Sequence, residues 1–203
     1  MQEGAFMQLN PKLVGAGVAA AIAAGLGYAL LAAQDDETEF KTLEREGAFS
    51  VRDYPRLLVA ETVSLGMRES ALSRGFLALA DYICGKDRDG ARIPMTVPVL
   101  FDGDDDGRGW RTRFVMPARY TVETLPAPGE EVAIRSLPAR RIAAVRFAGE
   151  ASDAVLDAHE DALRGWMRGH RLRAAGPVEH AFYNPPFTPG LLRRNEVLIP
   201  LAA

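Results

Sequence analysis

The chain has 203 residues, of which 48% are hydrophobic and 25% are charged, enough material for one sizeable core and a segment outside it. Its formal net charge is -3, so the chain lacks the positive electrostatic field that nucleic-acid binding requires. The single cysteine, Cys84, excludes an internal disulfide and a cysteine-rich metal site. We therefore expect one globular domain that has no nucleic acid among its partners.

The first element is an uncharged stretch at residues 13–33, LVGAGVAAAIAAGLGYALLAA, which as a helix would span roughly 30 Å and match a bilayer core. Lys12 precedes it and acidic residues follow it. We therefore expect residues 1–12 in the cytoplasm and the domain on the periplasmic side of an inner membrane. A cleaved export signal is the alternative. Leu30 or Leu31 would then stand where signal peptidase requires a small residue, which favours a retained single-pass anchor.

The folded domain is expected at residues 47–203, after a charged linker at residues 34–46 that lacks strand periodicity. Residues 47–66 are rich in β-branched side chains and are interrupted at Pro55, which predicts two strands that bend at the proline. The apolar stripe of residues 68–84 predicts a helix, and Gly85 stands where a C-cap glycine belongs.

The next segment, RIPMTVPVL at residues 92–100, alternates like a strand but is apolar on both faces. Pro94 and Pro98 lie an even number of residues apart, so they remove N–H donors from the same edge. These features predict an edge strand that forms an apolar wall beside an opening in the sheet. An acidic turn at residues 101–109 and a return strand at residues 110–117 follow.

The second half of the domain repeats this order of elements. Residues 131–149 predict two strands broken at Pro138, and residues 152–169 predict a helix with Ser152 as its N-cap. Two further strands are expected at residues 182–187 and 195–201. Alignment of VRDYPRLLVAETVSLG with IRSLPARRIAAVRFAG matches four identical residues. The repeat predicts a duplicated β-α-β-β unit, with two antiparallel sheets back to back and one helix on each.

A series of segments resembles the SOUL / haem-binding protein family, in order from about Phe49 to Leu201: GFLALADYICGKD, RIPMTVPV, RFVMPARY, LPAPGEEVAIRSLPARRIAAVRFAG and YNPPFTPGLLRRNEV. The most specific pieces are MTVPV at residues 95–99 and RRNEV at residues 193–197. The resemblance implies an α+β fold, a distorted antiparallel β-barrel of two pseudo-symmetric halves flanked by two helices. It also implies binding of haem or another tetrapyrrole in an apolar groove at the first helix.

The resemblance suggests how such a ligand would be held. A mammalian member is thought to use an axial histidine at the position that is Asp53 here, so we expect no axial histidine. Other members hold haem through apolar contacts and basic side chains on the propionates. On that mode the candidate contacts are Ser73, Arg74, Leu77, Met95, Arg111, Arg113 and Met116. The two strand arginines share a face and could border the carboxylates; arginines on a solvated strand face are the alternative.

Metal-binding patterns are weak in this sequence. His159, His170 and His180 show no metal-ligand spacing. The acidic turn begins like a calcium-binding loop, but Arg113 stands at the position where a bidentate glutamate is needed. Cys84 lies at the C-terminal end of the predicted helix and is expected to be a buried structural cysteine.

A catalytic constellation is equally hard to find. Tyr183 and Glu196 would form a pair if their strands are adjacent, as a small-molecule hydrolase would require. Glu196 is more simply the ion-pair partner of Arg193, Arg194 or Arg52. We therefore predict reversible, non-covalent binding of haem or a related tetrapyrrole, for transport, buffering or sensing, by a protein that is not an enzyme. A protein- or peptide-interaction module and a hydrolase are the alternatives.

Overall fold

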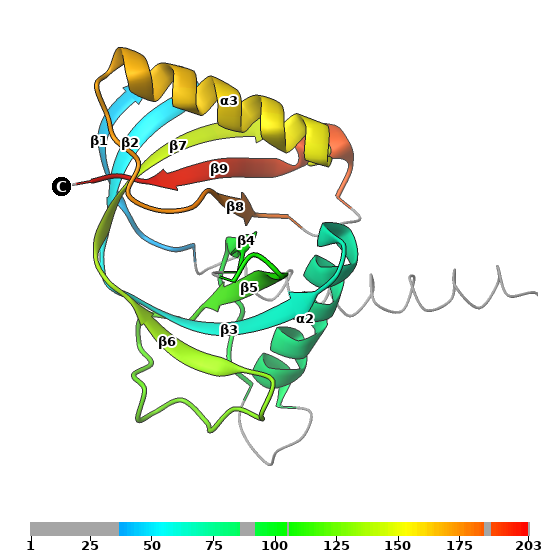
Figure 1. The fold of residues 1–203 in the computed structure, drawn as a ribbon. Coiled ribbons are helices and arrows are strands. Elements are labelled where there is room, and N and C mark those ends of the chain that lie inside the picture. Colours follow the sequence, from blue (N-terminus) through cyan, green and yellow to red (C-terminus); the bar gives the residue numbers. More distant parts are fainter. Residues whose placement is uncertain (1–36, 86–91, 105, 185–187, 203) are drawn as a thin grey trace, which may run out of the picture.

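The computed structural model describes residues 37–85, 92–104, 106–184 and 188–202. They form one curled antiparallel sheet of nine strands with two helices packed against it (Figure 1). The predicted membrane anchor at residues 13–33 lies outside the described residues. Within these ranges the model has no helix that is both long and apolar enough to cross a bilayer.

The first half contains five strands and a helix: β1 (Lys41–Glu46), β2 (Phe49–Tyr54), β3 (Leu57–Leu65), α2 (Arg68–Cys84), β4 (Val99–Gly103) and β5 (Gly109–Val115). The second half contains β6 (Ala133–Leu137), β7 (Arg140–Ala148), α3 (Asp153–Gly169), β8 (Glu179–Phe182), a short 3-10 turn η1 (Gly190–Leu192) and β9 (Arg194–Pro200). The predicted breaks at Pro55 and Pro138 are confirmed. The helix predicted at residues 68–84 is confirmed at both ends. Gly85 adopts the left-handed conformation (φ 69°) that suits glycine.

In the strand order β1-β2-β7-β9-β8-β4-β5-β3-β6, strands of the two halves pair at three places, β2 with β7, β3 with β6 and, at the centre, β8 with β4. The prediction of two separate sheets is therefore wrong, because this central pairing makes them one. Both helices cover the same face. On the other face Val59 of β3 and Ile142 of β7 share a hydrophobic cluster although four strands separate β3 from β7 in the sheet. Such contact requires a curled sheet, so this second face is concave and the fold is a half-barrel.

The predicted alignment of the two halves agrees with the observed register. It makes Val51 equivalent to Ile134 and Ala60 equivalent to Ala143. The structure pairs Val51 with Ala143 and Ala60 with Ile134, so each half contributes equivalent residues to an equivalent contact. The repeated unit is β-β-α-β-β. Gene duplication as its origin stays a prediction.

Three expectations about individual segments are corrected. Residues 41–46, placed in a linker, form the edge strand β1, whose exposed side chains give no alternation to detect. Strand β8 ends at Phe182, where the predicted strand was to begin. The prediction of Ser152 as the N-cap of α3 is confirmed, although its side chain makes no capping hydrogen bond. Cys84 is exposed, not buried.

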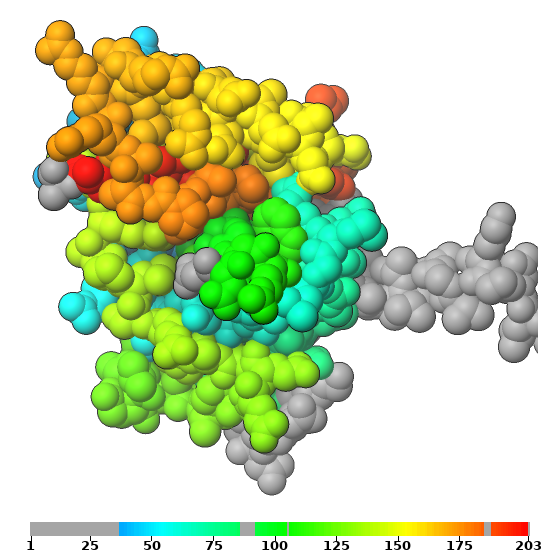
Figure 2. Space-filling view, in the orientation of Figure 1, coloured from blue at the N-terminus to red at the C-terminus, as the bar shows by residue number. Residues whose placement is uncertain are grey.

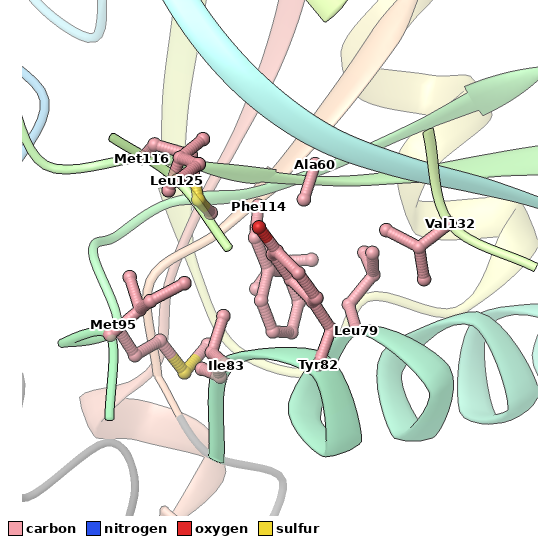
Figure 3. Close-up of a cluster of buried hydrophobic side chains, with 11 residues drawn as sticks. Ala60, Leu79, Tyr82, Ile83, Met95, Phe114, Met116, Leu125 and Val132 are labelled. Atoms are coloured by element: carbon pink, nitrogen blue, oxygen red, sulfur yellow. The ribbon is translucent and has the colours of Figure 1, made fainter. Parts of the chain in front are cut away.

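The proline-bearing segment at residues 92–98 precedes the strand, and within it Val97 forms an isolated bridge with Glu37. Strand β4 begins at Val99, directly after the second proline, because proline cannot donate to a strand ladder. It pairs with β5 on one side and β8 on the other, so the prediction of an edge strand is wrong. The side chains of Ile93 and Met95 enter the core beneath α2, a cluster that also contains Leu79 and Phe114 (Figure 3).

Candidate functional site

A cleft lies between the start of α2 and the residues that lead into α3. Its volume is about 790 Å³, within the range of roughly 300–1,000 Å³ that is typical of small-molecule sites. One wall comes from the first turns of α2, the other from the start of α3, and the floor from β4, β8 and β9. The lining residues are Arg68, Glu69, Leu72, Ser73, Phe76, Val99, Glu150, Ala151, Ser152, Asp153, Ala154, Phe182, Asn184, Arg193 and Asn195.

The position of the cleft follows from the meeting of the two helix starts. Arg68, the first residue of α2, forms an ion pair with Asp153, the first residue of α3. The same guanidinium donates a hydrogen bond to the carbonyl oxygen of Ala151 at 3.4 Å. Figure 2 shows the start of α3 (yellow) touching the start of α2 (cyan to teal) at this point. The ion pair therefore links the two walls of the cleft.

The cleft combines an apolar interior with a polar rim. Phe76, Val99 and Phe182 supply rings and aliphatic surface from three different elements. At the rim, the Asn195 side-chain amide donates to the carbonyl oxygen of Gly149 at 2.9 Å, which ties β9 to the segment before α3. The first arginine of the RRNEV motif, Arg193, is held by a hydrogen bond from its Nε to the carbonyl oxygen of Thr188 at 2.8 Å. Such a surface suits a flat apolar molecule that carries charge at its edge.

A buried histidine lies on the same face of β8 as Phe182, two residues earlier. His180 is 8% exposed, and its Nδ1 has no hydrogen-bond partner within the described part of the chain. Burial, assisted by the positive charge of Arg68, lowers the pKa of His180 to about 4. Its imidazole is therefore neutral at physiological pH. It does not line the cleft. His159 and His170 each place Nδ1 against a carbonyl oxygen of α3 itself.

The predicted contacts on α2 are divided by the structure. Ser73 lines the cleft, and its hydroxyl donates to the carbonyl oxygen of Glu69 at 3.0 Å. Leu77 lies one turn farther along the helix, partly exposed and outside the lining. Arg74 turns away, because its guanidinium donates to the carbonyl oxygen of Leu65 at the end of β3.

The two predicted methionines do not border the cleft. Met95 and Met116 are buried among the side chains beneath the second half of α2 (Figure 3). Neither belongs to the cleft lining, and each fills core space next to Ile83 or Leu125. The structure gives both a packing role, and contact of either with a ligand stays a prediction.

The two arginines of the predicted rim lie on the concave face of the sheet, opposite the cleft. Thr112, between the two arginines, points toward α2, so Arg111 and Arg113 point to the concave face. Arg113 donates to Asp102 Oδ1 at 2.6 Å and to Glu61 Oε2 at 3.1 Å. Arg111 Nη1 lies 3.4 Å from Asp102 Oδ2. Both belong to a concave ionic network and do not border the cleft.

The proposed hydrolase pair also lies on the concave face. Tyr183 donates a hydrogen bond to Glu196 at 2.9 Å, and Arg52 donates to both oxygens of the same carboxylate at 2.6 and 3.1 Å. Burial would raise the pKa of Glu196, but the hydrogen bonds and charge of Arg52 outweigh it and hold the pKa below its usual value. Burial raises the pKa of Tyr183. The predicted pairing of Glu196 with Arg52 is confirmed, and it explains this cluster as an ion pair.

Asp53, in the family's axial-histidine position, lies on β2 and is remote from the cleft lining. Arg141 donates a hydrogen bond to it at 2.9 Å, and this bond lowers the pKa of its carboxyl. Within the described ranges no three His, Cys, Asp or Glu side chains converge as a metal site would require.

Sequence reasoning missed most of the lining residues. Arg193 and Asn195 stand in the RRNEV segment, so that motif was the available signal for them. Arg68 and the residues before α3 gave no signal, because they meet only when the two helices are placed side by side.

Comparisons with known proteins bear on this geometry. Residues 35–200 match the family model described as SOUL heme-binding protein. No curated protein sequence matches the chain. The fold resembles that of a hydrolase from Listeria innocua, with a TM-score of 0.55 at 13% identity over 79% of this chain and 94% of that one. It also resembles the EcmrR C-terminal domain, with a TM-score of 0.59 at 10% identity over 76% of this chain and 96% of that one. At these identities the two likenesses show the fold alone.

Proposed function

Since the chain belongs to the SOUL haem-binding protein family, we propose that its cleft between α2 and α3 binds haem or a related tetrapyrrole reversibly. The observation that carries this proposal is the cleft itself: an apolar slot of about 790 Å³ between two helices, with arginines at its edge. The ligand is held without covalent chemistry. Transport, buffering and sensing of a tetrapyrrole would all use such a site.

The lining residues match the chemistry of a porphyrin. Its flat faces are apolar and suit Leu72, Phe76 and Phe182. Its two carboxylates are costly to desolvate alone, and an arginine can bind a carboxylate through two hydrogen bonds. Arg193 and Arg68 stand in the lining for this purpose, while Glu69, Glu150 and Asp153 limit the number of anionic groups that the cleft accepts.

Binding without an axial histidine is part of the proposal. Asp53 occupies the family's histidine position and is paired with Arg141, and His180 lies outside the lining. Haem and an iron-free porphyrin should therefore bind with similar affinity. Placement of the domain on the periplasmic side of an inner membrane is a further proposal, supported by the uncharged residues 13–33 and the charges that flank them.

The test uses two tryptophan variants of the full chain, titrated with haemin and with protoporphyrin. Ser73→Trp places a large ring inside the cleft, and we expect at least a tenfold weaker affinity for both ligands. Leu77→Trp places the same ring one turn along α2 and outside the lining, so its affinity should match that of the wild type. Tryptophan fluorescence quenching and the Soret band report binding.

Three outcomes would count against the proposal. Absence of saturable binding by the wild type would show that the protein does not bind a tetrapyrrole. Equal affinity of the Ser73→Trp and Leu77→Trp variants moves the ligand out of this cleft. A haemin-specific Soret shift that disappears in His180→Ala would show that the histidine ligates iron, contrary to the axial-free mode.

A further inference from the structure

Residues 37–40 lie across the concave face, on the side of the sheet opposite the cleft. The backbone N–H of Thr38 donates to the carbonyl oxygen of Val97 at 2.9 Å, and Glu37 forms a parallel bridge with the same residue. The segment therefore pairs through its main chain, as an added strand does, before it continues into β1.

Two side chains of this segment, Phe40 and Glu37, contact arginine side chains that lie beside tyrosine rings. The ring of Phe40 lies 5.0 Å from that of Tyr54, and the Arg52 guanidinium stands 4.4 Å from the Phe40 ring centre. Glu37 forms a 2.8 Å ion pair with Arg194. That guanidinium in turn lies 3.6 Å from the centre of the Tyr183 ring. The segment thus contributes one aromatic ring and one carboxylate to the concave face, about 10 Å apart along an extended backbone.

The segment fits this surface incompletely. Three buried polar atoms here, Thr38 Oγ1, Arg140 Nε and Arg194 Nε, have no hydrogen-bond partner in the described part of the chain. A buried polar atom that stays unpaired destabilises the folded state. A residual cavity of about 10 Å³ is lined by Thr38 and Arg140, room for at most about one water, and Arg194 does not line it. A peptide that forms hydrogen bonds with these three atoms would bind the concave face more favourably than this segment does.

The charges beneath the segment favour an anionic occupant. Arg52 binds Glu196, and Arg140 binds Glu179 at 2.8 Å, so these two pairs are neutral. Arg194 has one positive charge beyond them, which it shares between Glu196 at 3.2 Å and Glu37 at 2.8 Å. Removal of Glu37 would leave this site with one excess positive charge.

We propose that the concave face is a second binding site, for an extended peptide of another chain that carries a carboxylate three residues before an aromatic ring. Residues 37–40 occupy it as an internal ligand. The main-chain pairing at Val97 selects a peptide, because strand addition recognises the backbone while side-chain pockets give specificity. The excess charge of Arg194 selects the carboxylate. Nothing in this proposal depends on tetrapyrrole binding, which uses the opposite face.

The experiment weakens the internal ligand and supplies the same sequence in trans. The full-length double variant Glu37→Gln/Phe40→Ala is titrated with a fluorescent peptide of residues 35–42, DDETEFKT, and binding is followed by anisotropy. The double variant should bind the peptide at least tenfold more tightly than the wild type, whose own segment competes at an effective concentration in the millimolar range. Glu39→Gln, an exposed position between the two substitutions, is the matched control and should behave like the wild type.

Two outcomes of this titration would contradict the proposal. The proposal is overturned if the folded double variant does not bind the peptide, or if the peptide DDQTEAKT binds as well. Hydrogen exchange of the wild type supplies a test that needs no variant. The Thr38 amide should exchange much faster than amides in the β7–β9 ladder; exchange only at the rate of global unfolding would show that the segment never leaves.

Discussion

The two faces of the sheet bury titratable side chains in different ways: as ion pairs on the concave face, and as a neutral histidine on the helix-covered face. On the concave face, Arg52, Glu196 and Tyr183 satisfy one another, and Arg113 satisfies Asp102. On the helix-covered face, His180 is buried with an unpaired Nδ1 and stays neutral. The first arrangement links β2 to β9 and β5 to β4 through buried ion pairs. The proposed ligand cleft lies on the same face as His180, between the starts of the two helices.

The largest expected effect comes from breaking the concave pairing. Arg52→Leu leaves Glu196, which is fully buried, without its main partner, and breaking such a pair costs about 3–5 kcal/mol of unfolding free energy. Urea unfolding measures this loss. Arg52→Leu/Glu196→Leu should lose less than the single variant, because no unpaired charge stays buried.

A surface ion pair gives the control for this measurement. Arg141 and Asp53 are exposed and paired at 2.9 Å, so Arg141→Leu should leave the unfolding midpoint unchanged. If Arg52→Leu were as stable as Arg141→Leu, the concave network would contribute nothing to folding and the contrast between the faces would disappear.

On the helix-covered face, His180 makes stability depend on pH. The pKa of His180 is about 4 in the folded protein, against 6.5 for an unperturbed histidine. Between these values the unfolded chain binds a proton that the folded chain does not, so stability falls as pH falls. From pH 7 to pH 5 the loss from this residue is about 2 kcal/mol. His180→Gln should lose correspondingly less over the same range in urea unfolding at each pH, since the carboxylates of both proteins titrate alike. Equal pH slopes would show that the imidazole is not buried in its neutral form.

How far the sequence predicted these features depended on whether each was local. The helix at residues 68–84 was predicted at both ends, because its apolar stripe and Gly85 lie within the segment itself. Alternation predicted that Arg111 and Arg113 share a face, which they do, but it could not say which face, since both sides of a buried sheet are covered. The charged edge strand β1 has no apolar side to reveal it. The cleft depends on how α2 and α3 sit together, and no local pattern encodes that distance.

The smallest expected effect concerns the packing that sets one wall of the cleft. A Cβ added at Gly75 of α2 would stand 2.8 Å from the Thr112 Cβ of β5, so Gly75→Ala must push the helix away from the sheet. Overpacking of this kind costs about 1–3 kcal/mol, and the better helix propensity of alanine returns up to about 1 kcal/mol. We expect a net loss of about 1–2 kcal/mol in urea unfolding, together with altered porphyrin affinity, because Ser73 and Phe76 move with the helix. Gly165→Ala on α3 is the matched control: its Cβ would meet only Arg168 Nη2, at 3.6 Å, and it should stabilise the protein without changing affinity. Equal behaviour of the two variants would mean that α2 is not held by close contact with β5, and that the width of the cleft is set by the Arg68–Asp153 ion pair alone.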